Sequence, residues 1–393
     1  MEVGLVGKPN VGKSTFFNAA TRADVEMASY PFTTIDANRG VGYVRAPCPH
    51  EELGLECDPN NSPCLEGVRM IPVNIIDVAG LVPDAHSGKG LGNKFLDDLR
   101  QASTLIHIVD TSGSTDETGE PCKRGEHDPV EDIKFLDKEI DYWIKGILDK
   151  NWEKVSRRLE VSGGKLEKAV YDQLSGLGIR EASVIRALNE SELPEKVKSW
   201  TEDDLFVLAK NLRQKTKPMM IAANKSDLAS EEQIENITEL EYIVQPTAAE
   251  YELALRKASE KGLIDYIPGE DSFEILDGDI SERQRSALKK IEGYMKEKGG
   301  LGVQQCLEKA VYDLLDMIVV YPVENEHNYT DKEGRVLPDA YLVKKGSTAE
   351  DLAFVVHSDI GEGFIRAIDA RTDRVIGRDH ELKDGDIIKI VSK

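Results

Sequence analysis

The sequence is poor in basic charge, in cysteine and in long apolar runs. Its 393 residues carry 72 acidic and 50 basic side chains, a formal net charge of −22. This balance excludes a uniformly basic nucleic-acid coat, although a local basic patch remains compatible with it. Five cysteines are too few for a disulfide framework and favour a reducing compartment. No stretch approaches the roughly 20 apolar residues that span a bilayer, and the first residues, MEVGLVGKPN, do not read as a secretory leader. We therefore expect a cytoplasmic protein that has no membrane partner.

The chain does contain a pattern typical of a phosphate-binding loop. The apolar residues VGLV at 3–6 predict a buried strand, GKPNVGKS follows at 7–14, and a helical stretch comes next. A P-loop requires this order of strand, glycine-rich loop and helix. Backbone N–H groups of such a loop surround the α- and β-phosphates, Lys13 would reach the β- and γ-phosphates, and Ser14 would bind Mg²⁺. The motif predicts a nucleoside triphosphate without naming its base.

A second apolar run predicts the strand that carries the metal-binding carboxylate. The run VRMIPVNII ends in Asp77-Val78-Ala79-Gly80. An aspartate in this position can hold Mg²⁺ through water, and the N–H group of Gly80 can donate to the γ-phosphate. The segment YPFTTID lies between the two motifs, and either Thr33 or Thr34 could close over the Mg²⁺. Order along the chain favours Thr34.

The stretch KPMMIAANKSD predicts a strand that ends in a base-reading motif. The Asp227 carboxylate would accept hydrogen bonds from N1–H and N2–H₂ of guanine, whereas adenine offers neither donor. The Lys225 stem would cover one face of the base. After the next strand, a backbone N–H of Thr247-Ala248-Ala249 would meet the guanine O6. The alternative is an exposed NKSD turn that caps a helix, and the order of the preceding motifs disfavours it.

Two further regions flank these motifs. More than a hundred residues separate Asp110 from Met219, and apolar side chains recur there mostly at three- and four-residue steps. This periodicity predicts a helical hairpin or a coiled-coil-like arm at about 128–210. From 318 to 393, short apolar runs punctuated by glycine, aspartate and proline predict a small β-rich domain.

In this order the motifs resemble the Obg superfamily of GTPases, and PNVGKS, YPFTTID and DVAGLVPDAHSGKGLGNKFL resemble its YchF (Obg-like ATPase) subfamily in an archaeal-type form. The resemblance implies an α/β fold: a P-loop NTPase of the Ras-like type at 1–127 and 211–317, a helical insertion at 128–210, and a C-terminal β-grasp (TGS) domain at 318–393. It also implies a switch that hydrolyses GTP to GDP on the ribosome, with the helical arm or the TGS domain as a candidate for RNA contact.

The resemblance also bears on the base and on hydrolysis. ATP-preferring members often have glutamate in place of Asp227, so this chain favours GTP, with ATP as the alternative. Leu81 stands where small GTPases have a water-orienting glutamine, and the resemblance suggests His86 for that role. Asn10 is the residue that helps to hold K⁺ in potassium-stimulated relatives. The predicted nucleotide-binding residues are Asn10, Val11, Gly12, Lys13, Ser14, Thr15, Asn224, Lys225, Asp227, Thr247, Ala248 and Ala249; the catalytic residues are His86, Lys13 and Gly80; the metal ligands are Ser14, Thr34 and Asp77.

Two questions stay open at the level of sequence. Cys48, His50, Cys57 and Cys64 are residue types that bind zinc, but their spacings lack a close CxxC pair, so reduced thiols in a surface hairpin are preferred. The second question is whether hydrolysis is the function. A nucleotide-gated module that binds RNA or protein, with incidental hydrolysis, is the alternative to the switch.

Overall fold

The computed structural model describes residues 1–21, 38–78, 92–276 and 280–393. They divide into two compact units, each described here by itself. One unit comprises the described residues of Met1–Ala19, Ala37–Arg39 and Asn74–Cys306. The other comprises those of Ala20–Asp36, Gly40–Val73 and Leu307–Lys393.

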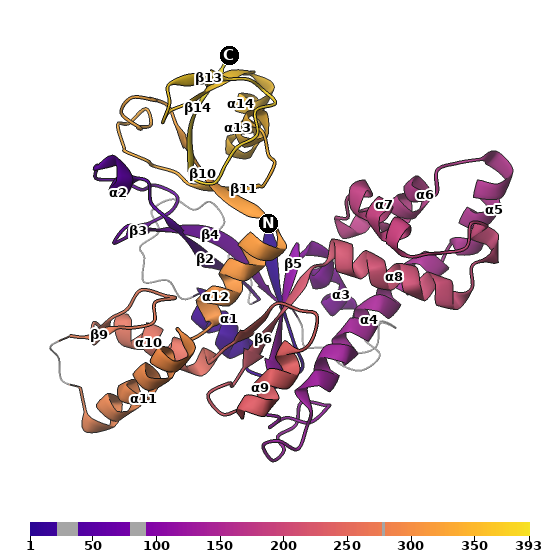
Figure 1. Cartoon of the computed structure of the whole chain (residues 1–393), viewed down its shortest axis with the longest axis horizontal. Coiled ribbons are helices and arrows are strands. Elements are labelled where there is room, and N and C mark those ends of the chain that lie inside the picture. The colour runs from indigo at the N-terminus through magenta and orange to yellow at the C-terminus, as the bar shows by residue number, and fades with distance from the viewer. Residues whose placement is uncertain (22–37, 79–91, 277–279) are drawn as a thin grey trace. The chain divides into compact units, whose positions relative to one another are not determined.

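The larger sheet of the fold has its strands in the order β2-β4-β1-β5-β6-β7, and β3 pairs with β4 (Figure 1). The strands are β1 (Glu2–Val6), β2 (Arg39–Pro47), β3 (Cys64–Leu65), β4 (Val68–Asp77), β5 (Thr104–Asp110), β6 (Met219–Asn224) and β7 (Val244–Pro246). Neighbours from β4 to β7 are parallel. All seven residues of β5 and all six of β6 are buried, as expected for parallel strands covered on both faces.

This topology gathers the predicted motifs. The carboxyl ends of parallel strands meet at one edge of a sheet, which is where α/β folds bind ligands. At this edge β1 is followed by the P-loop, β4 ends at Asp77, β5 at Asp110 and β6 at Asn224. Motifs far apart in the sequence therefore converge, as the predicted P-loop NTPase fold requires.

Further helices and a two-stranded ribbon complete the first unit. They are α1 (Lys13–Thr21), α3 (Gly92–Gln101), α9 (Glu231–Thr238), α10 (Ala249–Ser259), α11 (Glu282–Lys298), α12 (Val303–Glu308), β8 (Ile264–Asp265) and β9 (Glu274–Ile275). The last two residues of α1 and of α12 are assigned to the second unit. The side chain of Ser281 caps α11. No helix in the described ranges is long and apolar enough to cross a bilayer.

The stretch between β5 and β6 is helical, as predicted, and its helices pack as a bundle. Its elements are α4 (Pro129–Asp149), α5 (Trp152–Ser162), α6 (Leu166–Leu174), η2 (Ser175–Leu177), α7 (Glu181–Glu190), η3 (Val197–Ser199) and α8 (Glu202–Thr216). In Figure 1, α4 and α8 run side by side. Their apolar faces join one core with Val6 and Leu105 of the sheet, and Trp143 and Trp152 are buried in that core. A capping box of Thr201 and Asp204 starts α8.

The C-terminal residues form a second sheet, in the order β11-β10-β14-β12-β13. Its elements are β10 (Met317–Val323), β11 (Tyr341–Lys344), α13 (Ala349–Val356), α14 (Ser358–Glu362), β12 (Phe364–Asp369), β13 (Arg374–Ile376) and β14 (Asp386–Ser392), preceded by the π-helical turn η4 (Lys309–Leu314). The strands β10 and β14 are parallel and central, and Leu352 and Ala353 of α13 pack into the core of the sheet. This is the β-grasp arrangement predicted for a TGS domain. The second unit also contains the short helix α2 (His50–Leu53).

Candidate nucleotide-binding site

The loop between β1 and α1 can form only with small or adaptable residues at three positions. Gly12 has a φ of 95° and Asn10 a φ of 62°, both in the left-handed region that most side chains avoid. A Cβ atom on Gly12 would lie 2.3 Å from Nδ2 of Asn224, and one on Gly7 would lie 2.6 Å from the carbonyl oxygen of Ile108. The loop is therefore pressed against the ends of β5 and β6, with α1 starting directly after it.

The phosphate and metal motifs meet through an ion pair. Lys13, the first residue of α1, contacts the carboxylate of Asp77 at the end of β4. Both side chains are partly buried, and Ser14 and Thr15 follow Lys13 on the first turn of α1. The Ser14 hydroxyl and the Asp77 carboxylate are oxygen donors, the type of ligand that Mg²⁺ prefers. The residues present therefore fit the Mg²⁺ ion that P-loop GTPases use.

Asn224 joins the P-loop to the predicted base-reading loop. Its side chain is 3 % exposed. Its Nδ2 donates to the carbonyl oxygen of Val11 at 2.8 Å, and its Oδ1 accepts from the backbone N–H of Ala249 at 3.1 Å. One buried amide thus positions both loops, because each hydrogen bond ends on a backbone group of a different loop.

Lys225 makes a contact that the sequence did not reveal. Its Nζ donates at 2.8 Å to Oδ2 of Asp110, a residue with no exposed surface at the end of β5. Burial alone would raise the pKa of Asp110, but hydrogen bonds from Lys225, Ser112 and Ser114 outweigh burial and lower the pKa below its usual value. The ion pair fixes the Lys225 stem, which was predicted to cover the base. The sequence feature that could have indicated this ion pair is Asp110, a carboxylate at the end of the strand that neighbours the one ending in Asn224.

Ser226 lies in the loop that is predicted to read the base. This residue is buried; its hydroxyl donates to the carbonyl oxygen of Thr247 at 2.8 Å and lies 2.5 Å from the hydroxyl of Tyr294. The neighbouring Asp227 is partly exposed. The pKa of Tyr294 is raised, mainly by burial. The hydrogen bond with Ser226 lowers this pKa, and the negative charge of Asp227 raises it further. Asp227 is therefore close enough to Tyr294 to influence its ionisation.

The predicted O6 donors are all engaged within the protein. The N–H of Thr247 donates to Ala223 at 2.9 Å, that of Ala248 to Leu301 at 2.9 Å, and that of Ala249 to Asn224 at 3.1 Å. A base that meets one of these groups must share it or displace its acceptor. The role of residues 247–249 in reading the base stays a prediction.

The P-loop also contacts the segment that follows β5, which sequence reasoning missed. Lys8 is 5 % exposed, and its Nζ donates to the carbonyl oxygen of Thr115 at 3.0 Å and lies 2.7 Å from a carboxylate oxygen of Asp132 in α4. Asn10 donates through Nδ2 to the carbonyl oxygen of Gly119 at 2.9 Å, which leaves its Oδ1 as the atom for the predicted K⁺. These contacts depend on tertiary packing, and no sequence motif announces them.

Three predicted site residues lie outside the described residues. They are Thr34, the predicted metal ligand, and Gly80 and His86, predicted to act in catalysis. The same holds for Leu81. Their roles stay predictions.

Comparison with known proteins agrees with this arrangement. Residues 2–150 match the family described as "50S ribosome-binding GTPase", residues 222–325 the "Obg-like GTPase YGR210-like, G4 motif-containing domain", and residues 326–392 the "TGS domain". The chain is 55 % identical to an uncharacterized GTP-binding protein, MJ1332, of Methanocaldococcus jannaschii, over 99 % of this chain and 98 % of that protein. It is 28 % identical to the ribosome-binding ATPase YchF of Bacillus subtilis, over 99 % of this chain and 98 % of that protein.

Solved structures support the same assignment. A GTP-binding protein from Pyrococcus horikoshii is 45 % identical, with a TM-score of 0.79 and full coverage of both chains. The YchF GTPase of Schizosaccharomyces pombe is similar in fold, with 19 % identity, a TM-score of 0.59 and coverage of 100 % of this chain and 97 % of that one. From the converging P-loop, Asp77 and NKSD motifs, the TGS domain and these relatives, it follows that the chain belongs to the YchF and Obg-like family of P-loop GTPases.

Proposed function

We propose that this protein binds GTP and hydrolyses it to GDP and phosphate as a nucleotide-dependent switch. The observation that carries the proposal is the Asn224 side chain, which ties the P-loop to the loop at 247–249 and so aligns phosphate and base recognition. Asp227 follows three residues later with a carboxylate suited to the two adjacent donors of guanine. Retention of Asp227 favours GTP over ATP.

Each site residue has a proposed part in hydrolysis. Backbone N–H groups of residues 10–15 and the Lys13 ammonium bind the phosphates and stabilise charge that develops on them. Ser14, Asp77 and Thr34 would hold Mg²⁺, which neutralises phosphate charge when bound. His86 would orient or accept a proton from the attacking water, and the N–H of Gly80 would contact the γ-phosphate.

The partner that we propose is the ribosome or one of its subunits, in the cytoplasm. The matching family is described as ribosome-binding, as is the YchF relative. We propose that a nucleotide-binding domain at 1–127 and 211–317 signals its state through the helical insertion at 128–210 and the TGS domain at 318–393, either of which could contact RNA. K⁺ held by Oδ1 of Asn10 would offset phosphate charge.

One observation favours an ATPase of the same fold as the second candidate. The N–H of Ala248 donates to the carbonyl oxygen of Leu301, so the O6 of guanine must compete for this donor. A carbonyl oxygen at that place suits the exocyclic amine of adenine better than it suits a second carbonyl oxygen.

Nucleotide competition on the full-length protein tests the proposal. We expect GTP to displace a fluorescent GDP analogue at concentrations at least about 10-fold below those of ATP, because a carboxylate that pairs with two donors contributes about 1.5–3 kcal/mol. Asp227→Asn should abolish this preference, and Asp203→Asn, on the exposed face of α8, should preserve it. Phosphate release is then measured with and without ribosomes, in K⁺ and in Na⁺. Tighter binding of ATP than of GTP would overturn the guanine assignment; nucleotide-dependent ribosome binding without stimulated hydrolysis would favour the nucleotide-gated module.

A further inference from the structure

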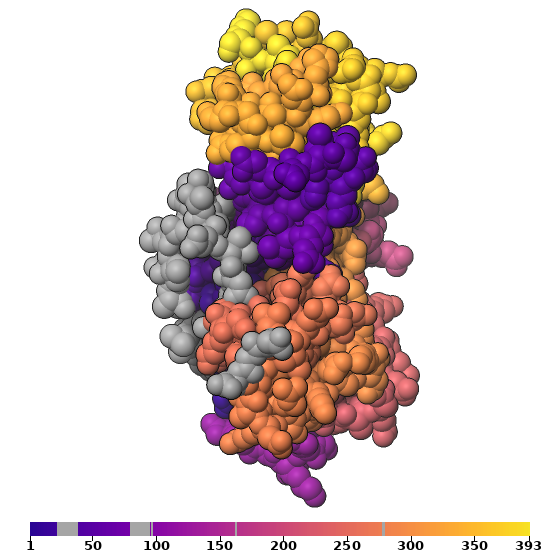
Figure 2. Space-filling view, turned by 90° about the vertical axis from the view of Figure 1, so that its left-hand side faces the viewer, coloured from indigo at the N-terminus to yellow at the C-terminus, as the bar shows by residue number. Residues whose placement is uncertain are grey.

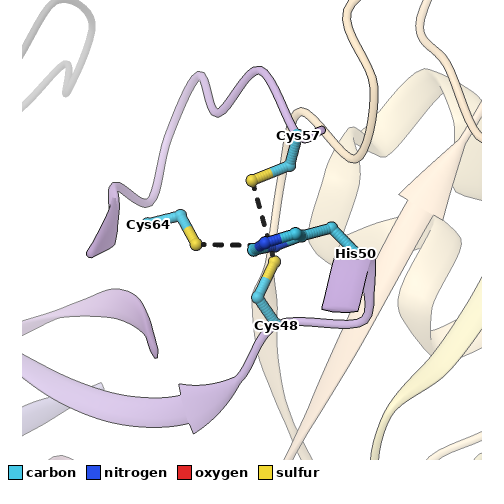
Figure 3. Close-up of side chains that lie close together, drawn as sticks. All are labelled: Cys48, His50, Cys57 and Cys64. Carbon is cyan, nitrogen blue, oxygen red and sulfur yellow. Dashed lines mark hydrogen bonds between the residues drawn. The ribbon is translucent and has the colours of Figure 1, made fainter. Parts of the chain in front are cut away.

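Four potential metal ligands meet in the second unit, and none of them is among the residues assigned to nucleotide. They are Cys48 after β2, His50 at the start of α2, Cys57 in the following loop and Cys64 in β3. Figure 3 shows their side chains pointing toward one another. The three sulfur atoms and one ring nitrogen all lie within 4.8 Å of one another.

The distances match those of a tetrahedral zinc shell. Zinc–sulfur bonds of about 2.3 Å and zinc–nitrogen bonds of about 2.0 Å place two ligating sulfurs ~3.8 Å apart, and a sulfur and a nitrogen ~3.6 Å apart. The Sγ atoms of Cys48 and Cys57 are 3.9 Å apart, and Sγ of Cys64 lies 3.7 Å from Nδ1 of His50. A disulfide needs about 2.05 Å between sulfurs, and the three cysteines of the cluster are unbridged. The cluster therefore has the spacing of ligands around one ion.

Backbone hydrogen bonds fix the positions of the ligands. The N–H of Cys48, a residue 3 % exposed, donates to the carbonyl oxygen of Gly67 at 2.8 Å. Gly54 ends α2 in the left-handed conformation with a φ of 64°, which turns the chain back toward Cys57. Cys64 is held in the β3–β4 hairpin opposite Arg69. The four ligands thus come from a folded frame, and a tight site requires such preorganisation.

The charge of the surroundings suits a bound ion. Three thiolates, a neutral histidine and Zn²⁺ carry a net charge of −1. The Arg69 guanidinium is fully buried, donates to the carbonyl oxygens of Ser62 and Leu337, and interacts electrostatically with Cys48. A buried cation beside the cluster offsets this charge.

The loop at 48–64, which carries the four ligands, is also hydrogen-bonded to the C-terminal domain of its own unit. The N–H of Asp58 donates to Val336 at 2.8 Å, that of Asn60 to Pro338 at 2.6 Å, and Oδ1 of Asn61 accepts from Ala340 at 2.9 Å. Figure 2 shows the purple residues of this segment directly against the orange and yellow residues of the C-terminal domain. An ion that orders residues 48–64 would therefore order the support of the β-grasp sheet.

We infer that Cys48, His50, Cys57 and Cys64 bind one structural Zn²⁺ ion, which fixes the loop at 48–64 against residues 336–340. Four protein ligands complete a tetrahedral shell and leave no position for a catalytic water, so the role is structural. The inference is independent of nucleotide identity and of hydrolysis.

Metal analysis of the full-length protein purified without chelator is the first experiment. We expect about one zinc per chain, and less than a tenth of that in Cys57→Ser and Cys64→Ser. Cys122→Ser is the matched control, because Cys122 lies outside the cluster, and it should retain the full zinc content. A wild-type protein that contains no zinc after growth with added zinc, or one that contains iron instead, would overturn the inference.

A second measurement covers variants that do not fold. Wild-type protein is stripped with a chelator and titrated with Co²⁺, which should give the intense visible absorption of tetrahedral thiolate coordination at one equivalent. Added Zn²⁺ should displace it and raise the thermal unfolding midpoint. Absence of the thiolate bands, with all thiols of the untreated protein open to a thiol reagent, would also overturn the inference.

Discussion

Replacing Asn224 by alanine tests whether this side chain anchors the P-loop and the loop at 247–249. The side chain is buried and satisfies two backbone groups, the carbonyl oxygen of Val11 and the N–H of Ala249. Alanine leaves both groups without that partner, and a buried unsatisfied polar group costs about 1–3 kcal/mol. We therefore expect the free energy of unfolding to fall by about 3 kcal/mol. Nucleotide affinity should fall on the order of 100-fold, because the two loops lose their shared anchor.

Urea unfolding followed by tryptophan fluorescence and circular dichroism measures the first quantity, and titration with a fluorescent GDP analogue measures the second. Asn211→Ala is the control, because Asn211 makes one hydrogen bond, to the hydroxyl of Ser191 at 2.8 Å within the helical bundle. It should lower the free energy of unfolding by about 1 kcal/mol and leave nucleotide affinity unchanged. The reasoning is refuted if Asn224→Ala destabilises no more than the control, or if it binds nucleotide normally while folded.

Two further substitutions test the charges beneath the site. Lys225→Met leaves the buried Asp110 carboxylate without its cation and should cost about 3–5 kcal/mol at pH 7. Because the folded-state pKa of Asp110 is lowered, the stability that it contributes is fully present above its unfolded pKa of about 4 and is lost as pH falls below that value. The difference from wild type in urea titrations should therefore shrink as pH falls below about 4, and a constant difference there would contradict this account. His107 in β5 is fully buried, and burial, aided by the charge of Lys8, lowers its pKa to about 3. The unfolded chain therefore binds a proton between pH 6.5 and 3 that the folded chain does not, so the wild-type protein loses stability as pH falls through this range. His107→Leu should remove about 2 kcal/mol of that loss between pH 6.5 and 5. If the free energy of unfolding of the variant falls with pH as steeply as that of wild type, other groups cause the loss.

The fold could be predicted from the sequence because its signals are local. The buried strands β1 and β6 are mainly apolar runs, and each leads directly into residues of the site. Glycine and aspartate punctuate the short strands of the C-terminal domain in the same way. The shape of the helical insertion could not be predicted, because helical periodicity shows which face is apolar but not which partner covers it. In the structure α8 and the main sheet both contribute to that cover.

The site was predictable only as far as its motifs reach. The sequence identified Asn224 as a base-side residue, yet its two contacts are to the P-loop and to the loop at 247–249. Lys225 was assigned to the base, and its ammonium group is bonded to Asp110. These pairings follow from the parallel register that places Asp110 opposite Asn224. A motif gives the residue type at one strand end, and sheet order decides which other strand end it meets.

The cysteine cluster is a second case in which the sequence shows the residue types but not that they meet in space. A close CxxC pair signals a zinc site because a tight turn alone brings two sulfurs together. Here Cys48, Cys57 and Cys64 are separated by longer stretches, so their convergence requires a short helix, a left-handed glycine and the β3–β4 hairpin together. Each of these elements is weak by itself, and a two-residue strand has little stability in isolation. The hairpin therefore needs support from outside itself. Hydrogen bonds between residues 58–61 and 336–340 connect it to the C-terminal domain, and the four ligands would connect it to the ion. For this reason, removal of zinc should loosen the support of the TGS domain and leave the Asn224 anchor, in the other unit, intact.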